Sequence, residues 1–334
     1  MHMDKKLSKK ATLLLTALAL GMLVSCGSPA SQTSQEVPAS QPAATPTAAL
    51  LTPGEPGAPT RSIRDMDSSL KAAEKRAVTG DKFLDNLYER PFTSKEMLYL
   101  PDIDINFATI TSDDQFHYFS ILLQAVSDGS MPGGMYGVEF DRNLTGRGDL
   151  LVLAEQLTTA WSTAGVKAYI DKNQDVGGSK PVDGETGFSG DGYESQLMFE
   201  GNKVAYVRFI TADNPIVQFA VSRALLEDPE KFLWGVWADR AMQNPARMDY
   251  NDVFSRRQAG SPIKDSEFYP LNELHSIDNT CRLPYGFDAT FGYKGICLSV
   301  PVPKEGGGCP WPVTCIVVGQ YRLCYCIDPS EPIN

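Results

Sequence analysis

Two short loops carry closely spaced oxygen side chains, the ligand type that hard cations such as Ca²⁺ prefer. In the first loop, residues 141–149, oxygens stand at relative positions one, three, five and nine around a glycine; they belong to Asp141, Asn143, Thr145 and Asp149. In the second loop, residues 171–178, the first three positions repeat as Asp171, Asn173 and Asp175, but the twelfth position is Val182 where an EF-hand has glutamate. Because Asn and Asp also cap turns without a metal, each loop is predicted to be either a calcium site or a solvated turn.

The residue types that catalysis needs are sparse. Two histidines follow the first 25 residues, and one of them, His117, lies in an apolar run that favours a structural role. No G-x-S-x-G, H-E-x-x-H, P-loop or dinucleotide motif occurs in the chain. Glu139 and Asp141 share a strand face and could flank a glycosidic bond. His117 with Met135 or Met198 could ligate haem. A glycoside-processing enzyme and a haem-binding domain are therefore the alternatives to a non-catalytic binding protein.

The tryptophans are the side chains most able to stack on a sugar ring. Trp234 and Trp237 are three residues apart, so on a strand they face opposite sides of the sheet. One of them could fill the core while the other contacts a glycan. Trp161 and Trp311 are the other two tryptophans. Burial in the core is the alternative for all of them.

The cysteines divide between the two ends of the chain. One, Cys26, lies near the start, and the other six lie between residue 281 and the C-terminus: Cys281, Cys297, Cys309, Cys315, Cys324 and Cys326. An even count in a Gly- and Pro-rich exported segment predicts three disulfides of open connectivity. Cys324 and Cys326 point to opposite faces of a strand, so they should bond elsewhere. A zinc site is the competing interpretation, but there is no C-x-x-C pair.

The N-terminal segment has the order of a bacterial lipoprotein signal. Lysines 5, 6, 9 and 10 precede an apolar run over residues 11–24, which ends in Leu23-Val24-Ser25-Cys26. Such a run is too short for a full membrane span and suits a signal peptide. We therefore expect the Cys26 thiol to be lipidated and the mature protein to be extracytoplasmic, anchored in the cell membrane by its acyl chains and exposed at the cell surface or in a periplasm.

The charge of the chain limits its partners. The chain has 41 acidic and 30 basic residues, a net charge of -11; residues 1–25 hold four lysines and one aspartate, so the mature chain carries -14. An acidic surface argues against nucleic acid as a partner. No second apolar run of 18 or more residues occurs, so membrane association is expected to depend on the lipid.

Composition divides the chain into four parts. Residues 1–25 are the signal peptide, and residues 26–80 are a Pro-, Ser-, Thr- and Ala-rich tether with a short polar helix over 67–77 that Asp67 can cap. Residues 81–275 are the folded β domain, and residues 276–334 are the Cys-rich module that disulfides should staple. The tether is expected to be flexible because it has few large apolar residues.

Alternating apolar and polar residues predict the strands of the β domain. The clearest are residues 136–141, 149–154, 166–170, 216–221 and 232–238, and the run 115–125 is apolar on both faces, as in a central strand. Residues 193–199 and 204–210 flank Gly201-Asn202, which predicts a hairpin. A short helix is expected after Ser222, before Pro229. Strands at this spacing favour a mainly β chain with an antiparallel β-sandwich.

The order of these elements is similar to that of a known family. Asp113-Asp114 before the central strand, the strand 136–141 that opens a polar loop, and residues 217–226 followed by 232–239 resemble family 9 carbohydrate-binding modules and the related DOMON-like sandwiches over residues 95–260. The resemblance implies a sugar ligand, and for some DOMON domains haem.

Together these patterns predict a lipid-anchored, non-catalytic binding protein whose ligand is a glycan and whose loops hold calcium. The alternatives are a structural or adhesive envelope protein that binds other proteins, a glycoside-processing enzyme, and a haem-binding domain.

Overall fold

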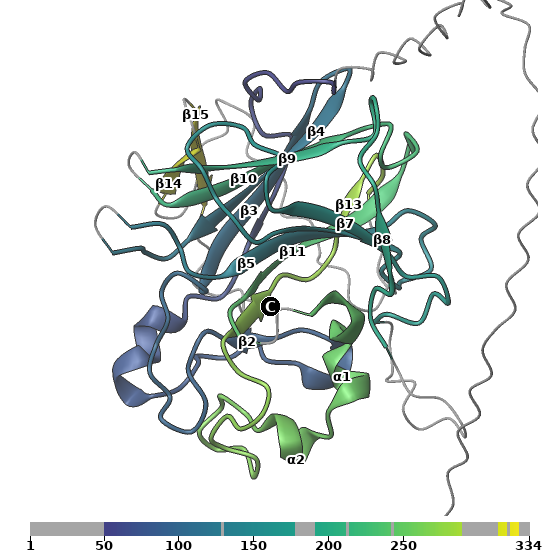
Figure 1. The fold of residues 1–334 in the computed structure, drawn as a ribbon. Helices are drawn as coiled ribbons and strands as arrows, with labels where there is room; N and C mark the ends of the chain where they lie inside the picture. Colours follow the sequence, from purple (N-terminus) through teal and green to yellow (C-terminus); the bar gives the residue numbers. More distant parts are fainter. Residues whose placement is uncertain are drawn as a thin grey trace, which may run out of the picture. The chain divides into compact units, whose positions relative to one another are not determined.

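Antiparallel β-strands make up most of the secondary structure (Figure 1). The computed structural model describes residues 50–127, 130–177, 191–211, 214–241, 244–288, 313–318 and 321–326. The chain divides into two units, residues 1–46 and 47–334, and the described residues all belong to the second. The predicted signal peptide and Cys26 lie outside the described residues.

The described elements are the following, in chain order: β1 (Arg61–Arg64), η1 (Ser68–Glu74), η2 (Phe83–Asp85), β2 (Glu89–Arg90), β3 (Ile105–Ser112), β4 (Phe116–Leu123), β5 (Met135–Asp141), β6 (Leu150–Ala154), β7 (Val166–Ile170), β8 (Ser195–Leu197), β9 (Ala205–Ile210), β10 (Ile216–Ser222), β11 (Phe232–Asp239), η3 (Pro245–Arg247), α1 (Tyr250–Val253), α2 (Arg256–Ala259), β12 (Ile277–Asn279), β13 (Leu283–Tyr285), β14 (Val313–Val318) and β15 (Tyr321–Cys326). The η elements are 3₁₀ helices, and no described helix is long and apolar enough to cross a membrane.

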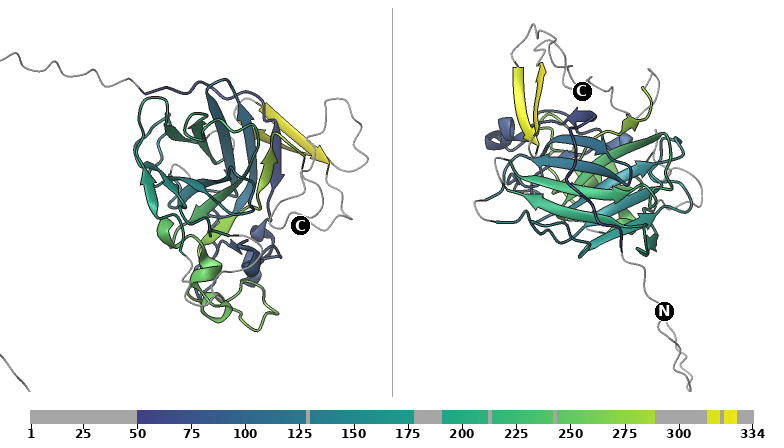
Figure 2. Two further views of the ribbon diagram at one scale, coloured as in Figure 1. Left: turned by 90° about the vertical axis from the view of Figure 1, so that its right-hand side faces the viewer. Right: turned by 90° about the horizontal axis from the view of Figure 1, so that it is seen from above.

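The strands form two large sheets and a hairpin. One sheet has the order β1-β3-β4-β10-β9, and the other has the order β2-β12-β11-β5-β6-β7-β8, with β13 also paired to β11. The two sheets share one hydrophobic core, to which Phe119 and Val217 contribute from the first sheet and Val138 and Trp234 from the second. This sandwich-like pairing of sheets is visible in Figure 2. β14 and β15 pair as a separate hairpin.

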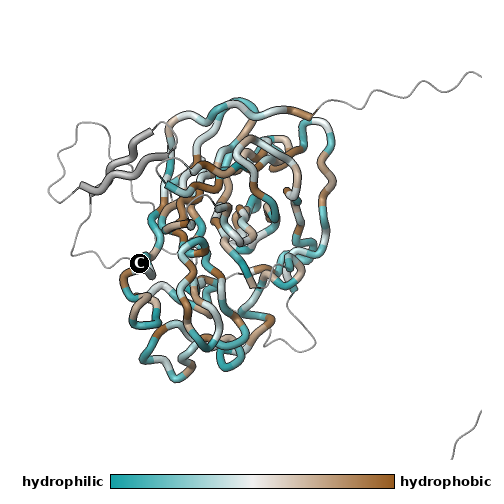
Figure 3. Tube along the Cα trace, turned by 60° about the vertical axis from the view of Figure 1, so that its left-hand side comes forward, coloured by the Kyte–Doolittle hydropathy of each residue, from teal (hydrophilic) through white to brown (hydrophobic). Residues whose placement is uncertain are grey.

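The predicted alternation decides which side chains enter this core. In β5, Tyr136, Val138 and Phe140 face the core between the sheets, as the sequence predicted. β4 is buried along its whole length, which confirms the prediction of a central strand. The hydropathy colouring in Figure 3 shows apolar residues gathered along the interior strands. The mainly β, antiparallel class predicted from sequence is therefore confirmed.

A second apolar layer covers the far face of the eight-stranded sheet. It joins Leu151, Leu153 and Trp237 of the sheet to Tyr88 and Tyr250 from the segments outside it. Tyr250 belongs to α1, which lies with α2 below the sheet in the view of Figure 1. The eight-stranded sheet is therefore covered on both faces, and this explains why β5, β6 and β11 contain no exposed position.

Two local predictions differ from the structure. The chain does turn at Gly201, where residues 200 and 203 form a bridge, but β8 pairs with β7 and β9 pairs with β10. The expected hairpin is thus wrong because its two arms enter different sheets. The expected helix after Ser222 is a series of hydrogen-bonded turns, which ends where Glu227 and Asp228 adopt positive φ.

The folded unit also begins before the predicted boundary at residue 81. β1 pairs with β3, and the backbone N–H of Leu51 donates to the carbonyl of Gly201. Glu55 forms an ion pair with Arg208 of β9. The predicted polar helix is the 3₁₀ helix η1, and Asp67 caps it by accepting the Ser69 N–H at 3.0 Å. Polar composition alone did not reveal that residues 50–80 belong to the fold.

Candidate metal centre

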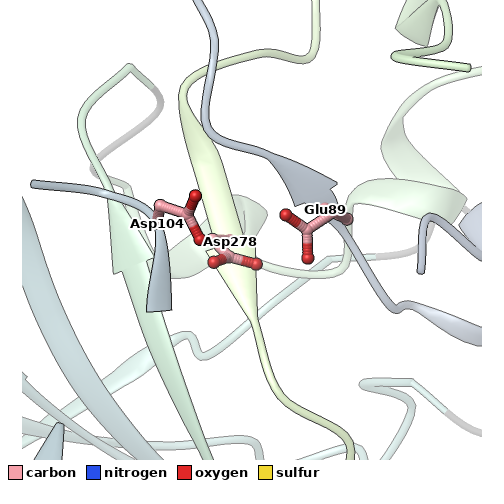
Figure 4. Close-up of side chains that lie close together, drawn as sticks. All are labelled: Glu89, Asp104 and Asp278. Carbon is pink, nitrogen blue, oxygen red and sulfur yellow. The ribbon is translucent and has the colours of Figure 1, made fainter. Parts of the chain in front are cut away.

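Three acidic side chains from separate segments meet in the interior of the protein (Figure 4). They are Glu89 of β2, Asp104 just before β3, and Asp278 of β12, and we call them the carboxylate cluster. One carboxylate oxygen from each lies within 4.8 Å of the other two. Their relative exposures are 2%, 0% and 0%. A group of buried acids this close together is costly unless something neutralises it.

Strand pairing brings the three residues together. β12 pairs with β2 in a register that sets Asp278 directly opposite Glu89. Residues directly opposite on antiparallel strands have Cβ atoms about 5 Å apart, a position where like charges are destabilising. The Ile105 backbone N–H donates to Asp278 Oδ2 at 2.7 Å, which holds the start of β3, and with it Asp104, against β12.

The hydrogen bonds within the cluster do not satisfy all of its carboxylate oxygens. Ser68 Oγ donates to Glu89 Oε1, and Tyr99 Oη donates to Asp104 Oδ2 at 2.6 Å. The remaining oxygens of the two aspartates, Asp104 Oδ1 and Asp278 Oδ1, are buried and have no hydrogen-bond partner. Since buried polar atoms are nearly always satisfied in folded proteins, these two oxygens call for a partner.

Asp65 is a fourth acid beside the cluster. It directly follows β1, its Oδ1 accepts the Met66 N–H at 2.9 Å, and its Oδ2 is buried without a partner. Burial raises the pKa of Asp65 to about 7. Asp65 in turn raises the pKa of Glu89, Asp104 and Asp278, so it lies within their electrostatic reach.

The negative charges of the cluster are not balanced by a basic side chain among the described ion pairs. Burial is the largest cause that raises the pKa of Glu89, Asp104 and Asp278 well above the ordinary range, and neighbouring carboxylates add to it. None of the ion pairs found among the described residues includes any of these three acids or Asp65. Two carboxylates about 4.8 Å apart repel each other by roughly 3.5 kcal/mol at an effective dielectric constant of about 20.

The spacing of the oxygens fits one hard cation. Oxygens that lie within 4.8 Å of one another can all bind one calcium ion, since Ca²⁺–O distances are about 2.3–2.6 Å and ligands on opposite sides of the ion are about 4.6–5.2 Å apart. Mg²⁺ needs shorter bonds of about 2.0–2.1 Å in a strict octahedron, and zinc prefers nitrogen and sulfur ligands that this cluster lacks. The residues can therefore hold Ca²⁺. Their burial keeps them from a polymeric substrate, so they are poorly placed for acid–base catalysis.

The first predicted calcium loop is closed by its own hydrogen bonds. Asp141 accepts the N–H groups of Thr145 and Gly146 with its two oxygens, at 3.1 and 2.7 Å. Asp149 forms an ion pair with Arg142, and Asn143 Oδ1 accepts the Thr145 N–H. An ion would have to displace these donors. Calcium in this loop stays a prediction, and the geometry is that of an Asx-capped turn.

The second predicted loop is closed only in part. Asp171 accepts the N–H groups of Gln174 and Val176, and Asn173 Nδ2 donates to Asp175 Oδ2 at 2.9 Å. The other oxygen of Asp175 is buried without a partner. Of the seven predicted metal ligands, Asp175 is thus the one that has an oxygen in need of a partner.

The predicted sugar-binding tryptophans both lie in the interior. Trp234 and Trp237 face opposite sides of β11, as predicted, but their relative exposures are 0% and 1% because both faces of the sheet are covered. Neither indole presents a face to solvent. Trp161 is half-buried, with Arg208 Cζ 4.2 Å from its ring centroid. Trp311 lies outside the described residues.

The residues of the catalytic and haem alternatives have structural surroundings. Glu139 is buried and accepts hydrogen bonds from Arg282 and Tyr193. Burial alone would raise the pKa of Glu139, but the positive charge of Arg282 and these hydrogen bonds together lower it. His117 is buried, and its Nδ1 lies 2.6 Å from Ser112 Oγ. Burial lowers the pKa of His117 to about 4, so the ring is neutral near pH 7.

The predicted disulfide framework lies mostly outside the described side chains. Cys281 is disulfide-bonded. The backbone register of the hairpin sets Cys315 of β14 opposite Cys324 of β15, and Cys326 opposite Val313. Cys297 and Cys309 lie outside the described residues. The pairing of the six cysteines stays a prediction.

Sequence reasoning missed the carboxylate cluster because no local pattern encodes it. Glu89, Asp104 and Asp278 come from three segments that lie far apart in the sequence: β2, the residue before β3, and β12. The available signal was weak: Asp104 stands between two isoleucines, and Asp278 directly follows Ile277. Comparison of the chain with protein-family models, with curated proteins and with solved structures finds no match.

Proposed function

We propose that this protein is a lipid-anchored, extracytoplasmic binding protein without enzymatic activity, and that Ca²⁺ bound by the carboxylate cluster is part of its folded state. Two observations carry the calcium proposal: Asp104 and Asp278 each have a buried oxygen without a partner, and one carboxylate oxygen from each of Glu89, Asp104 and Asp278 lies within 4.8 Å of the other two. A divalent cation supplies both the missing partner and the missing positive charge.

A structural role for the ion fits its surroundings better than a catalytic one. The three ligands come from β2, the start of β3 and β12, so the ion joins segments from both sheets. Asp65 adds the segment that follows β1, an edge strand. Because the carboxylates are buried, the ion acts on the stability of the fold and not on a bound substrate.

An extracytoplasmic location supports the same proposal. The predicted lipidation of Cys26 would place the folded unit outside the cytoplasm, at the end of the tether. Extracellular modules commonly bind Ca²⁺ with dissociation constants of about 10⁻⁴–10⁻³ M, so a site of modest affinity is filled there.

The proposed ligand of the protein is a glycan. A DOMON-like or family 9-like sandwich, and hence a glycan ligand, rests on the resemblance in the order of the strands. Since Trp234 and Trp237 are buried, a sugar would have to meet other aromatic side chains, and the half-buried Trp161 is one of them. A glycan array with the full-length protein, repeated with Trp161→Ala, tests this part separately.

Calorimetric titration of the full-length, chelator-treated protein with CaCl₂ tests the calcium proposal. We expect saturable binding that Glu89→Gln weakens at least tenfold, while Mg²⁺ at the same concentration competes poorly. The matched control is Glu227→Gln, whose side chain is 70% exposed. Binding that is unchanged in Glu89→Gln would show that the ion, if any, lies elsewhere.

A further inference from the structure

Residues 51–59, which we call the strap, cross the outer face of the five-stranded sheet. The strap begins where the Leu51 N–H donates to the carbonyl of Gly201, at 3.3 Å, in the turn before β9. It ends where the Thr60 N–H donates to the Ile110 carbonyl of β3, at 2.8 Å, directly before β1. Because β9 and β1 are the two edge strands of this sheet, the strap runs from one edge to the other.

The strap has a proline at every third position: Pro53, Pro56 and Pro59. Pro53 is buried, and Pro56 and Pro59 are half-buried. The residues between them are exposed, namely Gly54, Glu55, Gly57 and Ala58. A polyproline II helix has three residues per turn, so residues three apart lie on one face of it. The strap therefore has the periodicity of a polyproline II segment whose proline face is turned toward the sheet.

The sheet surface under the strap carries aromatic side chains, and we call it the aromatic face. Phe119 of β4 and Val207 of β9 point into the core, so their neighbours Tyr118 and Tyr206 lie on the outer side. The cluster on this side contains Phe116, Tyr118, Val204, Tyr206 and Ala220, with Leu51 of the strap, Trp161 and Phe199 packed against it. Aromatic-lined surfaces are the ones that proline-rich peptides bind in the polyproline II conformation.

Two aromatic side chains bind the backbone of the strap at one residue. The Gly54 N–H donates to Tyr118 Oη at 3.2 Å, and Trp161 Nε1 donates to the Gly54 carbonyl at 3.1 Å. The ring centroids of Tyr118 and Trp161 are 6.1 Å apart. A polyproline II segment makes no internal hydrogen bonds, so its backbone groups need partners of this kind. The aromatic face thus recognises the extended backbone as well as the prolines.

Arg208 adds recognition of an acidic side chain. Its two terminal nitrogens donate to the two oxygens of Glu55, at 2.7 and 2.6 Å. The Arg208 side chain is only 12% exposed and lies over the Trp161 ring, while Glu55 is 73% exposed. Arg208 Nε donates to Gln218, which donates to Ser120. The sheet therefore holds the guanidinium in place, and the strap supplies the carboxylate of a bidentate pair.

We propose that the aromatic face is a binding site for acidic, proline-rich peptides in the polyproline II conformation, and that the strap is the ligand that fills this site within its own chain. The proposal goes beyond the binding of calcium and does not depend on it. Its ligand is defined by three features of the strap: prolines three residues apart, a free backbone between them, and a carboxylate for Arg208. A glycan that contacts Trp161 would have to displace the strap.

A peptide of residues 50–60 with a fluorescent label tests the proposal by fluorescence anisotropy with the full-length protein. The strap is released by the triple variant Pro53→Ser/Glu55→Arg/Pro56→Ser. We expect this variant to bind the peptide at least about tenfold more tightly than the wild type, whose own strap competes. The matched control is Glu96→Arg, another exposed acid, which should bind the peptide no better than the wild type.

Two further measurements test the specificity of the site. A peptide that carries Glu55→Arg should bind the triple variant at least about tenfold more weakly, because it loses a charge-assisted pair. Adding Trp161→Ala to the triple variant should weaken binding of the unchanged peptide to a similar extent.

The proposal is overturned if the folded triple variant binds the peptide no better than the wild type, or if it binds the Glu55→Arg peptide equally well. Binding that survives Trp161→Ala would also overturn it. Should the triple variant not fold, Glu55→Arg alone is the second variant, since Arg208 repels the new side chain. If neither variant folds, the strap is an integral part of the fold and not an exchangeable ligand, and the proposal fails.

Discussion

Replacing Asp278 with asparagine should have opposite effects with and without calcium. In the ion-free protein, Asp278 Oδ2 accepts the Ile105 N–H at 2.7 Å. An asparagine oxygen keeps this bond, and the new amide hydrogens can donate to Glu89 or Asp104. The substitution therefore removes a buried charge without breaking a hydrogen bond. With calcium present, the same change removes an anionic ligand of the ion.

The size of the effect follows from the spacing of the carboxylates. Asp278 faces two acids with oxygens within 4.8 Å, and each ionised pair costs roughly 3.5 kcal/mol at an effective dielectric constant of about 20. Proton uptake limits this cost, because neutralising an aspartate at pH 7 takes about 4 kcal/mol, near three pKa units at about 1.36 kcal/mol each. Asp278→Asn should thus stabilise the ion-free protein by at most about 4 kcal/mol, which corresponds to a rise in Tm of up to roughly 8 °C.

Thermal unfolding in chelator and in CaCl₂ measures both effects. At a Ca²⁺ concentration near 1,000 times Kd, the wild type gains about 4.1 kcal/mol, more than the variant's advantage of at most about 4 kcal/mol in chelator, and the variant should gain much less. The order of Tm values is therefore expected to reverse between the two conditions, while Asp228→Asn follows the wild type in both. A variant that melts below the wild type in chelator, together with no response of the wild type to calcium, would refute the reasoning.

Three further predictions test neighbouring parts of the account. In chelator, the free energy of unfolding should fall as the pH rises from about 4 to 7. The reason is that the pKa of Asp65 in the folded state, about 7, and the raised pKa values of the carboxylate cluster lie above the unfolded value near 4. Thermal unfolding at a series of pH values measures this loss, which should be absent when Ca²⁺ is present. His117 has a folded pKa of about 4, so its contribution to stability rises with pH below pH 6.5. This one histidine is outweighed by Asp65 and the three acids of the carboxylate cluster. Hydrogen exchange should show that chelation deprotects Arg61–Arg64 before the central strands, because Asp65 directly follows edge strand β1 and lies within electrostatic reach of the proposed ion. Arg282→Met should destabilise the fold by about 3–5 kcal/mol in denaturant titrations, since it leaves Glu139 buried and unpaired, yet the bound calcium per chain should not change.

Local sequence patterns were sufficient where the structure is locally determined. The alternation in β5 correctly placed Tyr136, Val138 and Phe140 in the core, and the doubly apolar run at β4 was correctly taken as a central strand. The three-residue spacing of Trp234 and Trp237 correctly predicted that they face opposite sides of the sheet. It could not show that both faces are covered, because the layer over Trp237 comes from segments as distant as Tyr88 and Tyr250.

Non-local pairing accounts for what sequence reasoning missed. Glu89 meets Asp278 only because β2 pairs with β12, and neither short strand has a periodic pattern that specifies its partner. The turn at Gly201 was predicted, but which sheet each arm joins depends on the rest of the fold. The predicted loops show the limit of motif reasoning from spacing: the oxygens of Asp141 are consumed by its own loop, whereas Asp175 is left with an unpartnered one.

One calcium ion is proposed to lie among Glu89, Asp104 and Asp278, and anomalous diffraction from crystals grown with CaCl₂ would locate it. We predict a calcium peak about 2.3–2.6 Å from Asp104 Oδ1, Asp278 Oδ1 and an oxygen of Glu89. A map without a peak there, in which the three side chains are bridged by protons or water at full calcium concentration, would contradict the claim.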